Sequence, residues 1–185
     1  MTKKEVLMKP SILIVDDEEE IQDVLEYYLR SLNVNILKAN DGEDALEILR
    51  REDIWVLVTD IKMPRMDGIT LGEEVRKFDH DLPIIYITAF NDKENMLNAL
   101  RIGALDFLNK PFDQEIVVHR VKNAIKVRRA RMSEQQLIQT LHDCLGIAYD
   151  PAVENMDLDK RFEYLNELTT IVSLQLERVN RKKNG

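Results

Sequence analysis

Five short apolar segments rich in β-branched residues recur between residues 11 and 109. They lie at residues 11–15 (SILIV), 34–38 (VNILK), 55–59 (WVLVT), 83–87 (PIIYI) and 105–109 (LDFLN). The first, third and fourth are continuously apolar rather than alternating, a pattern typical of strands that are covered on both faces. These segments predict the strands of a parallel sheet, with the first, third and fourth at its centre.

Apolar side chains with helical spacing separate these strands. The sets that share one helical face are Ile21, Val24, Leu25, Tyr28 and Leu32, then Ala45, Leu46 and Leu49, and finally Val117, Val121, Ala124 and Ile125. Strands that alternate with helices over short connections favour right-handed βαβ units stacked in a doubly wound sheet. The pattern therefore predicts an α/β fold of five strands, each followed by a helix.

The chain after about residue 126 follows a different pattern. Residues 126–148 continue the fifth helix or start a new one, residues 149–159 predict a turn around Asp150-Pro151, and residues 159–183 predict a last helix. In that helix apolar positions recur at alternating threes and fours, as in a coiled coil, at Phe162, Leu165, Thr169, Val172, Leu176 and Val179. About 50 residues are too few to bury a large core. We therefore expect a helical hairpin that packs on a partner protein or, as a homodimer, on a second copy.

Composition narrows the functional classes. The 185 residues are 44% hydrophobic and 32% charged, as in a soluble globular protein, and the net charge of −8 disfavours non-specific binding to nucleic acid or an anionic membrane. The single cysteine, Cys144, excludes an intramolecular disulfide and fits a reducing cytoplasm. No apolar run reaches the roughly 18 residues of a membrane span, and the first ten residues do not form a signal peptide. We expect a cytoplasmic protein without a membrane partner.

Polar side chains follow four of the predicted strands. Asp16 and Asp17 follow the first strand, Asp60 the third, Thr88 the fourth and Lys110 the fifth. The carboxyl ends of parallel strands meet at one edge of the sheet, where ligands bind, so these groups should converge. Clustered carboxylates repel one another unless a cation is present, and their oxygens suit Mg²⁺. Although any one of these residues alone is better explained as a helix cap or turn residue, the set predicts a metal-assisted phosphoryl site.

The segments ILIVDDEEEI, NDGEDALEIL, VTDIKMPRMDGITL, IIYITAF and GALDFLNKPF closely resemble the receiver domain of bacterial two-component response regulators. The resemblance covers about residues 10–130. It implies a flavodoxin-like five-stranded parallel sheet in the order 2-1-3-4-5 with a C-terminal α-helical extension. We thus expect a receiver domain at residues 1–130 and a helical dimerisation or partner-binding region at residues 131–185.

The resemblance also assigns roles at the predicted site. Asp60 would accept the phosphoryl group of a phosphohistidine on a sensor histidine kinase or a histidine phosphotransfer protein. Thr88 and Lys110 would hold the phosphoryl oxygens, and Phe107 would turn inward when Thr88 shifts. Such a protein would switch a helical protein-interaction output by covalent modification and would not itself be an enzyme.

Mg²⁺ is the cofactor that the resemblance implies. Its ligands would be the carboxylates of Asp16, Asp17 and Asp60 and the backbone carbonyl of Lys62. Next to this site, a bulky Phe90 would obstruct attacking water and prolong the life of the acyl phosphate, or would simply point to solvent.

Two alternatives concern the C-terminal region. TLHDCLG around His142 faintly resembles the phosphoacceptor region of some histidine kinases, so the protein could be a phosphorelay intermediate. An ordinary surface or interface histidine is the favoured interpretation. The basic runs KVRRAR and RVNRKK could contact nucleic acid, but solvated helix faces explain them better, and no helix-turn-helix pattern is present.

Overall fold

The computed structural model describes residues 9–89 and 93–183. The chain divides into two compact units, Met1–Arg129 and Ala130–Gly185, which are called the receiver unit and the C-terminal unit below. Phe90 and the side chain of Val179 lie outside what the structure describes.

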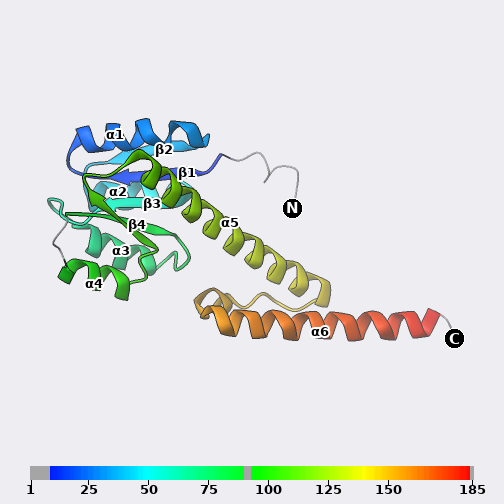
Figure 1. Cartoon of the computed structure of the whole chain (residues 1–185). Coiled ribbons are helices and arrows are strands. Elements are labelled where there is room, and N and C mark those ends of the chain that lie inside the picture. Colours follow the sequence, from blue (N-terminus) through cyan, green and yellow to red (C-terminus); the bar gives the residue numbers. More distant parts are fainter. Residues whose placement is uncertain (1–8, 90–92, 184–185) are drawn as a thin grey trace. The chain divides into compact units, whose positions relative to one another are not determined.

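Strands and helices alternate through the receiver unit (Figure 1). The strands are β1 (Ser11–Val15), β2 (Asn35–Ala39), β3 (Ile54–Asp60), β4 (Ile84–Ala89) and β5 (Asp106–Lys110). The helices are α1 (Glu19–Leu29), α2 (Gly42–Leu49), α3 (Gly68–Arg76), α4 (Lys93–Arg101) and α5 (Gln114–Leu145), and a 3-10 turn, Arg30–Leu32, follows α1. The five predicted strands are thus confirmed, with bounds that differ by at most two residues.

The five strands form one parallel sheet in the order β2-β1-β3-β4-β5. In the register of the central strands, Leu13 lies opposite Leu57, and Asp60 lies opposite Ile87. This order confirms the flavodoxin-like topology. Because β1 and β3 are neighbours, the residues that follow them are brought together at the carboxyl edge of the sheet.

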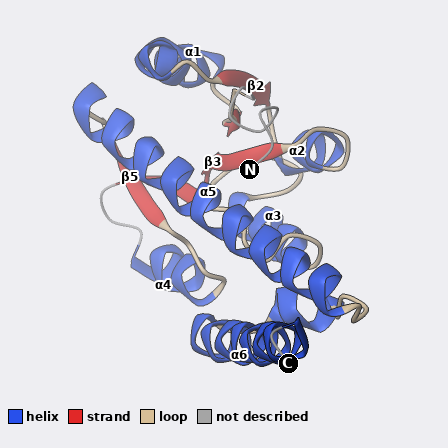
Figure 2. Ribbon diagram, turned by 90° about the vertical axis from the view of Figure 1, so that its right-hand side faces the viewer, coloured by secondary structure: helices blue, strands red, loops and turns tan. Residues whose placement is uncertain are grey.

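Helices cover both faces of the sheet (Figures 1 and 2). On one face Leu13 and Leu57 pack in a core closed by α2, α3 and α4. On α1 the predicted apolar face is partly wrong, because Val24 is 38% exposed whereas Leu29 and the polar Gln22 are buried. The buried face of α1 is therefore rotated from the one that counting apolar residues indicates.

The C-terminal unit contains the end of α5, a 3-10 helix (Pro151–Asn155) and α6 (Leu158–Lys183). The fifth helix thus continues unbroken to Leu145. The connecting segment leads the chain back, so that α6 runs in the same general direction as the end of α5 and the two do not form the simple antiparallel hairpin expected (Figure 1).

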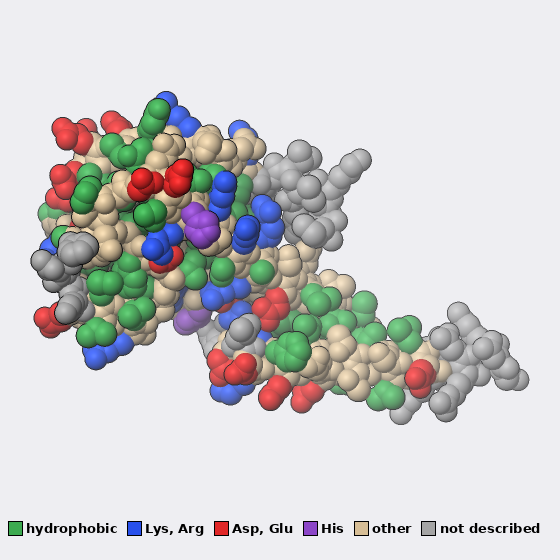
Figure 3. All heavy atoms as spheres, viewed as in Figure 1, with side chains coloured by type: hydrophobic (Ala, Val, Ile, Leu, Met, Phe, Trp, Pro, Cys, Tyr) green, Lys and Arg blue, Asp and Glu red, His purple; other side chains and the backbone are tan. Residues whose placement is uncertain are grey.

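The core of the C-terminal unit is small. Its buried apolar side chains are Ile138, Val153 and Leu168. Large apolar side chains remain exposed along α6, as the space-filling view shows (Figure 3); they are Phe162, Ile171, Leu174 and Leu176. No helix in the described ranges is long and apolar enough to cross a membrane.

Candidate functional site

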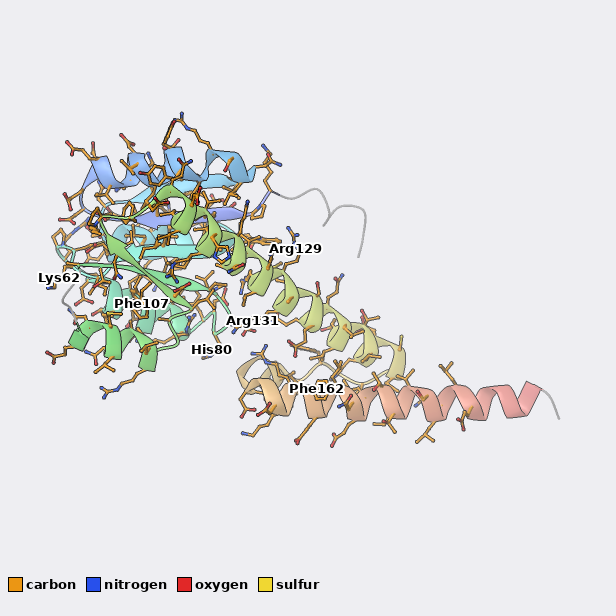
Figure 4. All side chains as sticks on the ribbon, viewed as in Figure 1. Lys62, His80, Phe107, Arg129, Arg131 and Phe162 are labelled. Carbon is orange, nitrogen blue, oxygen red and sulfur yellow. The ribbon has the colours of Figure 1, made fainter. Side chains whose placement is uncertain are left out.

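An open pocket of about 360 Å³ lies at the carboxyl edge of the sheet. Its lining comes from the carboxyl ends of β3, β4 and β5 and from the loops that follow β1 and β3. The lining residues are Asp17, Glu18, Asp60, Ile61, Lys62, Ile87, Thr88, Ala89 and Lys110. Lys62 lies at this end of the receiver unit and His80 at the opposite end (Figure 4). The pocket therefore brings together most of the residues that the sequence placed at one edge.

Three carboxylates lie around the Lys110 ammonium at the centre of this edge. The Lys110 ammonium lies 3.0 Å from Asp60 Oδ1 and 3.0 Å from Asp16 Oδ2, and it also lies 3.3 Å from Glu18 Oε1. The Asp16 side chain is fully buried and that of Asp60 is 11% exposed. Two carboxylates from neighbouring strands thus converge on one cationic position.

The surroundings shift the pKa of two of these groups, Asp16 and Lys110. Burial raises the pKa of the Asp16 carboxyl, and the hydrogen bond from Glu18 N–H and the nearby Lys110 ammonium offset this only in part. Burial alone would lower the pKa of Lys110, but the adjacent carboxylates of Asp60 and Asp16 outweigh that effect and raise it. The ammonium therefore stays charged, which suits a group that neutralises anionic oxygen.

The two oxygens of Asp16 have different surroundings. Asp16 Oδ1 accepts the backbone N–H of Glu18 at 3.0 Å. Asp16 Oδ2 is buried and accepts no hydrogen bond of good geometry from the residues that the structure describes, although the Lys110 ammonium lies close to it. A buried carboxylate oxygen in this state has lone pairs available to a cation.

The end of β3 holds Asp60 in place. Asp60 Oδ2 accepts the backbone N–H of Lys62 at 2.7 Å. The first residue of α3, Gly68, lies so close to the strand that a Cβ there would be 2.1 Å from the Asp60 carbonyl oxygen. Gly68 is thus explained by this close approach and not by the turn conformation that its position after Asp67 suggests.

Thr88 and Phe107 lie next to the pocket. Thr88 is 3% exposed, and its hydroxyl donates to the Ala89 carbonyl at 3.1 Å. Phe107 on β5 is half-buried and stacks on Tyr86, with ring centroids 6.2 Å apart and planes inclined by 29°. The hydroxyl of Tyr86 is buried and has no hydrogen-bond partner within residues 9–89 and 93–183, and burial raises its pKa. In this arrangement the Thr88 hydroxyl is engaged by the backbone.

Gln22 supports the site, although the sequence did not single it out. Its side-chain amide donates to the backbone carbonyl of Asp16 at 2.6 Å, and it also lies within hydrogen-bonding distance of Ala39 O at 3.0 Å and Asn40 Oδ1 at 2.9 Å. It therefore links the end of β1 to the end of β2. The only signal in the sequence is a polar residue among the apolar positions of the first helix.

His142 is buried in the C-terminal unit, only 1% exposed. Its Nδ1 lies 3.0 Å from the Ala148 carbonyl and its Nε2 lies 2.6 Å from the Tyr164 hydroxyl. The rings of Tyr149 and Tyr164 pack against it. The expectation of a surface or interface histidine is therefore wrong. Both ring nitrogens are engaged, an arrangement that also disfavours His142 as a phosphoacceptor.

Comparison with known proteins identifies the receiver unit independently of its geometry. Residues 12–122 match the family described as the response regulator receiver domain. Transcriptional regulator ycf27 of Porphyridium aerugineum is 36% identical over 120 residues, which are 65% of this chain and 50% of that protein. Regulatory protein VanR of Enterococcus faecium is 35% identical over 119 residues, 64% of this chain and 51% of VanR. The chain thus spans about half the length of these relatives.

Solved structures give the same result. A response regulator from Chloroflexus aurantiacus matches with a TM-score of 0.61 and 34% identity, over 64% of this chain and 99% of that one. A receiver domain of a Francisella response regulator matches with a TM-score of 0.59 and 30% identity, over 64% and 98% of the two chains. The matched family covers more than half of the sequence and contains the whole carboxyl edge described above. This chain belongs to the response regulator receiver domain family.

Proposed function

We propose that the protein is a phosphorylation-activated response regulator of a two-component signalling system, with Asp60 as its phosphoacceptor. The observation that carries the proposal is the convergence of Asp60 and Asp16 on the Lys110 ammonium, at 3.0 Å each, beside an open pocket. Membership of the receiver family supports the same assignment.

In the proposed reaction, a carboxylate oxygen of Asp60 attacks the phosphorus of a phosphohistidine on a sensor histidine kinase or a histidine phosphotransfer protein. The new P–O bond forms as the N–P bond breaks, and the imidazole leaves with the electron pair and takes up a proton from solvent. Such a transfer depends mainly on alignment and charge neutralisation. Lys110 provides a permanent positive charge for the phosphoryl oxygens, and the Thr88 hydroxyl becomes their donor by leaving the Ala89 carbonyl.

The residues present fit a divalent cation. Within the described residues, no three His, Cys, Asp or Glu side chains are arranged as a metal-ligand set. However, the Lys110 ammonium marks a position that both carboxylates reach, and Asp16 Oδ2 has lone pairs to give. Asp16, Asp17, Asp60 and the Lys62 carbonyl would hold Mg²⁺ there. The metal would supply charge neutralisation between the carboxylates and the incoming phosphoryl group.

Phosphorylation would act as the switch. It adds nearly two negative charges to the pocket, which attract Lys110 and the Thr88 hydroxyl. Movement of Thr88 would open space beside β4 for Phe107 to turn inward. The two-state element would then comprise α4, β5 and the receiver part of α5.

The test of this proposal is labelling by a small phosphodonor in the presence of Mg²⁺. Wild type should take up one phosphoryl group per chain, and Asp60→Ala should take up none. Asp53→Ala, which removes an exposed carboxylate at the other end of β3, serves as the matched control and should label like wild type. Labelling of Asp60→Ala near the wild-type stoichiometry would overturn the assignment.

For the output, we infer contact with a second copy through α6. Phe162 is 63% exposed and Leu176 is 58% exposed, and apolar side chains of this size are costly to leave in water. Light scattering of the whole chain, with Mg²⁺ and with or without beryllofluoride, should give the mass of a dimer in at least one state. The double variant Phe162→Gln with Leu176→Gln should give a single chain. A single-chain mass for wild type in both states would contradict this inference.

The relatives that are called transcriptional regulators raise a second output, contact with nucleic acid. The net charge of −8 disfavours it, and affinity for DNA that falls steeply with salt would support it. A cytoplasmic location, which the single cysteine suggests, stays a prediction.

A further inference from the structure

The loop that joins β3 to α3, residues 61–67, forms one wall of the Asp60 pocket, since Ile61 and Lys62 line it. The backbone N–H of Lys62 donates to Asp60 Oδ2 at 2.7 Å. At its other end the loop is closed by Gly68 N–H, which donates to the Ile61 carbonyl at 2.9 Å. The position of the Lys62 backbone therefore depends on how the middle of this loop is held.

The middle of the loop has a left-handed backbone at a residue that is not glycine. Arg65 has a φ of 59°. This conformation brings Cβ close to a carbonyl oxygen and is disfavoured for every residue with a side chain. A residue stays in such a conformation when the surrounding contacts determine it. The side chain of Arg65 provides those contacts.

The Arg65 guanidinium pairs with three carboxylates at the start of α2. Nη2 contacts Asp41 Oδ2 and lies 2.9 Å from Asp44 Oδ2, while Nη1 lies 3.4 Å from Glu43 Oε2. Asp41 is almost fully buried, and its Oδ1 caps α2 by accepting the N–H groups of Glu43 and Asp44 at 2.8 and 3.1 Å. One oxygen of Asp41 thus holds the helix and the other holds the loop.

A backbone contact joins the same two segments. Gly42 N–H donates to the Met66 carbonyl at 3.1 Å. A Cβ at Gly42 would be 2.6 Å from the Met66 side chain, so the loop and the helix approach each other as closely as glycine allows. Residues 65 and 66 are therefore attached to the first turn of α2 by both side chain and backbone.

We propose that Arg65 is a positioning residue of the Asp60 site: by attaching the left-handed turn of the β3–α3 loop to α2, it fixes the Lys62 backbone beside Asp60 and so sets the affinity of the site for a divalent cation. This inference rests on the proposed function, in which the Lys62 carbonyl is a metal ligand. Arg65 itself does not touch the metal or the phosphoryl group, and it acts through the loop.

The experiment is calorimetric titration of the unphosphorylated whole chain with Mg²⁺. Arg65→Gln should weaken Mg²⁺ binding about tenfold, as is usual for residues that orient metal ligands, and Arg65→Lys, which keeps a positive charge, should recover most of the affinity. Arg65→Gly relieves the backbone cost but removes the ion pairs, so it should also bind weakly. Arg51→Gln is the matched control, because Arg51 is an exposed arginine of the same region, 3.7 Å from Glu47.

The melting temperature of each variant separates positioning from general stability. If Arg65→Gln lowers the melting temperature but keeps the wild-type Mg²⁺ affinity, the inference is overturned. Wild-type affinity in Arg65→Gly would overturn it too, since the side chain would then be dispensable. Mg²⁺ binding by wild type that is lost in Asp16→Asn supports the proposed site whatever Arg65 does. Absence of binding by wild type would overturn both proposals.

Discussion

The receiver unit and the C-terminal unit differ in the size of their apolar cores. In the receiver unit every residue of β3 is buried, and helices cover both faces of the sheet. In the C-terminal unit three buried apolar residues form the centre of the core, while α6 keeps several large apolar side chains in contact with solvent. A unit of the first kind can be stable by itself. One of the second kind gains from burying its surface against another protein.

The two units also differ in whether the buried polar groups discussed above have hydrogen-bond partners. In the described part of the receiver unit Asp16 Oδ2 accepts no hydrogen bond of good geometry, and Asp60 borders an open pocket. In the C-terminal unit both ring nitrogens of His142 are engaged, and the buried Arg161 donates to the Met156 carbonyl at 3.0 Å. Polar groups that stay available for a ligand are expected at a reactive site, and satisfied ones in a structural core.

The largest effect should come from creating a cavity in each core. Leu57→Ala removes a fully buried side chain at the centre of the sheet, and we expect a loss of about 3–5 kcal/mol in the free energy of unfolding. Ile138→Ala in the C-terminal unit should cost nearer 2 kcal/mol, because a small core can relax around the gap. Urea unfolding measures both. Equal losses would mean that the smaller core is packed as rigidly as the sheet.

A smaller effect should follow neutralisation of Lys110, whose ammonium lies between the carboxylates of Asp16 and Asp60. Lys110→Gln leaves Asp16 and Asp60 facing each other, and we expect a loss of about 1–3 kcal/mol at neutral pH, with recovery on addition of Mg²⁺. The same substitution in the C-terminal unit, Lys160→Gln, affects an exposed pair with Asp157 at 3.0 Å and should change stability by less than about 0.5 kcal/mol. Equal losses of stability in Lys110→Gln and Lys160→Gln would contradict a stabilising role of Lys110 between Asp16 and Asp60.

The pH dependence of stability follows from the two raised pKa values. The pKa of Lys110 is raised by folding, so its contribution is complete below its ordinary pKa of 10.5 and is lost as the pH rises through the folded value. Asp16 is an acid whose pKa is also raised, so its ionisation destabilises the fold as the pH rises from 3.8 through the folded value. Urea midpoints measured across pH should fall in both windows for wild type. The alkaline window should shrink in Lys110→Gln, and an unchanged alkaline loss there would assign it to another group.

The smallest effect should come from one hydrogen bond in the C-terminal unit. Tyr164→Phe removes the hydroxyl that lies 2.6 Å from His142 Nε2, and we expect local destabilisation of about 1 kcal/mol. Hydrogen exchange of the amides of residues 138–168 should become faster. Tyr27→Phe, at an exposed tyrosine of α1, is the matched control and should leave exchange unchanged. An unchanged exchange rate in Tyr164→Phe would show that the Tyr164 hydroxyl does not help to hold His142, which would then rest on packing and on its contact with the Ala148 carbonyl.

Much of the receiver unit could be predicted because its signals are local. Continuous apolar runs gave the central strands, and their ends located Asp16, Asp60, Thr88 and Lys110 at one edge. The side-chain hydrogen bonds that connect the ends of neighbouring strands could not be predicted from such local patterns. Gln22 sits where an apolar residue is expected, because its amide satisfies carbonyls from two strands, and hydrophobic periodicity contains no information on such contacts.

The C-terminal unit was less predictable for a physical reason. Between Ala124 and Leu145 the sequence has no glycine or proline, and α5 continues until Gly146, which has a φ of 65°. The length of the fifth helix could therefore be read from the sequence. The burial of His142 could not, because it depends on Tyr164, which is distant in sequence and returns to it only through the connecting segment.

The assignment of Asp60 as phosphoacceptor is tested most directly by the mass of the intact chain after treatment with a small phosphodonor and Mg²⁺, followed by mapping of the modified peptide. We expect one phosphoryl group per chain, located on the peptide that contains Asp60 and released by base, as is typical of an acyl phosphate. A modified peptide that contains His142, or no modification under conditions in which the chain binds Mg²⁺, would contradict it.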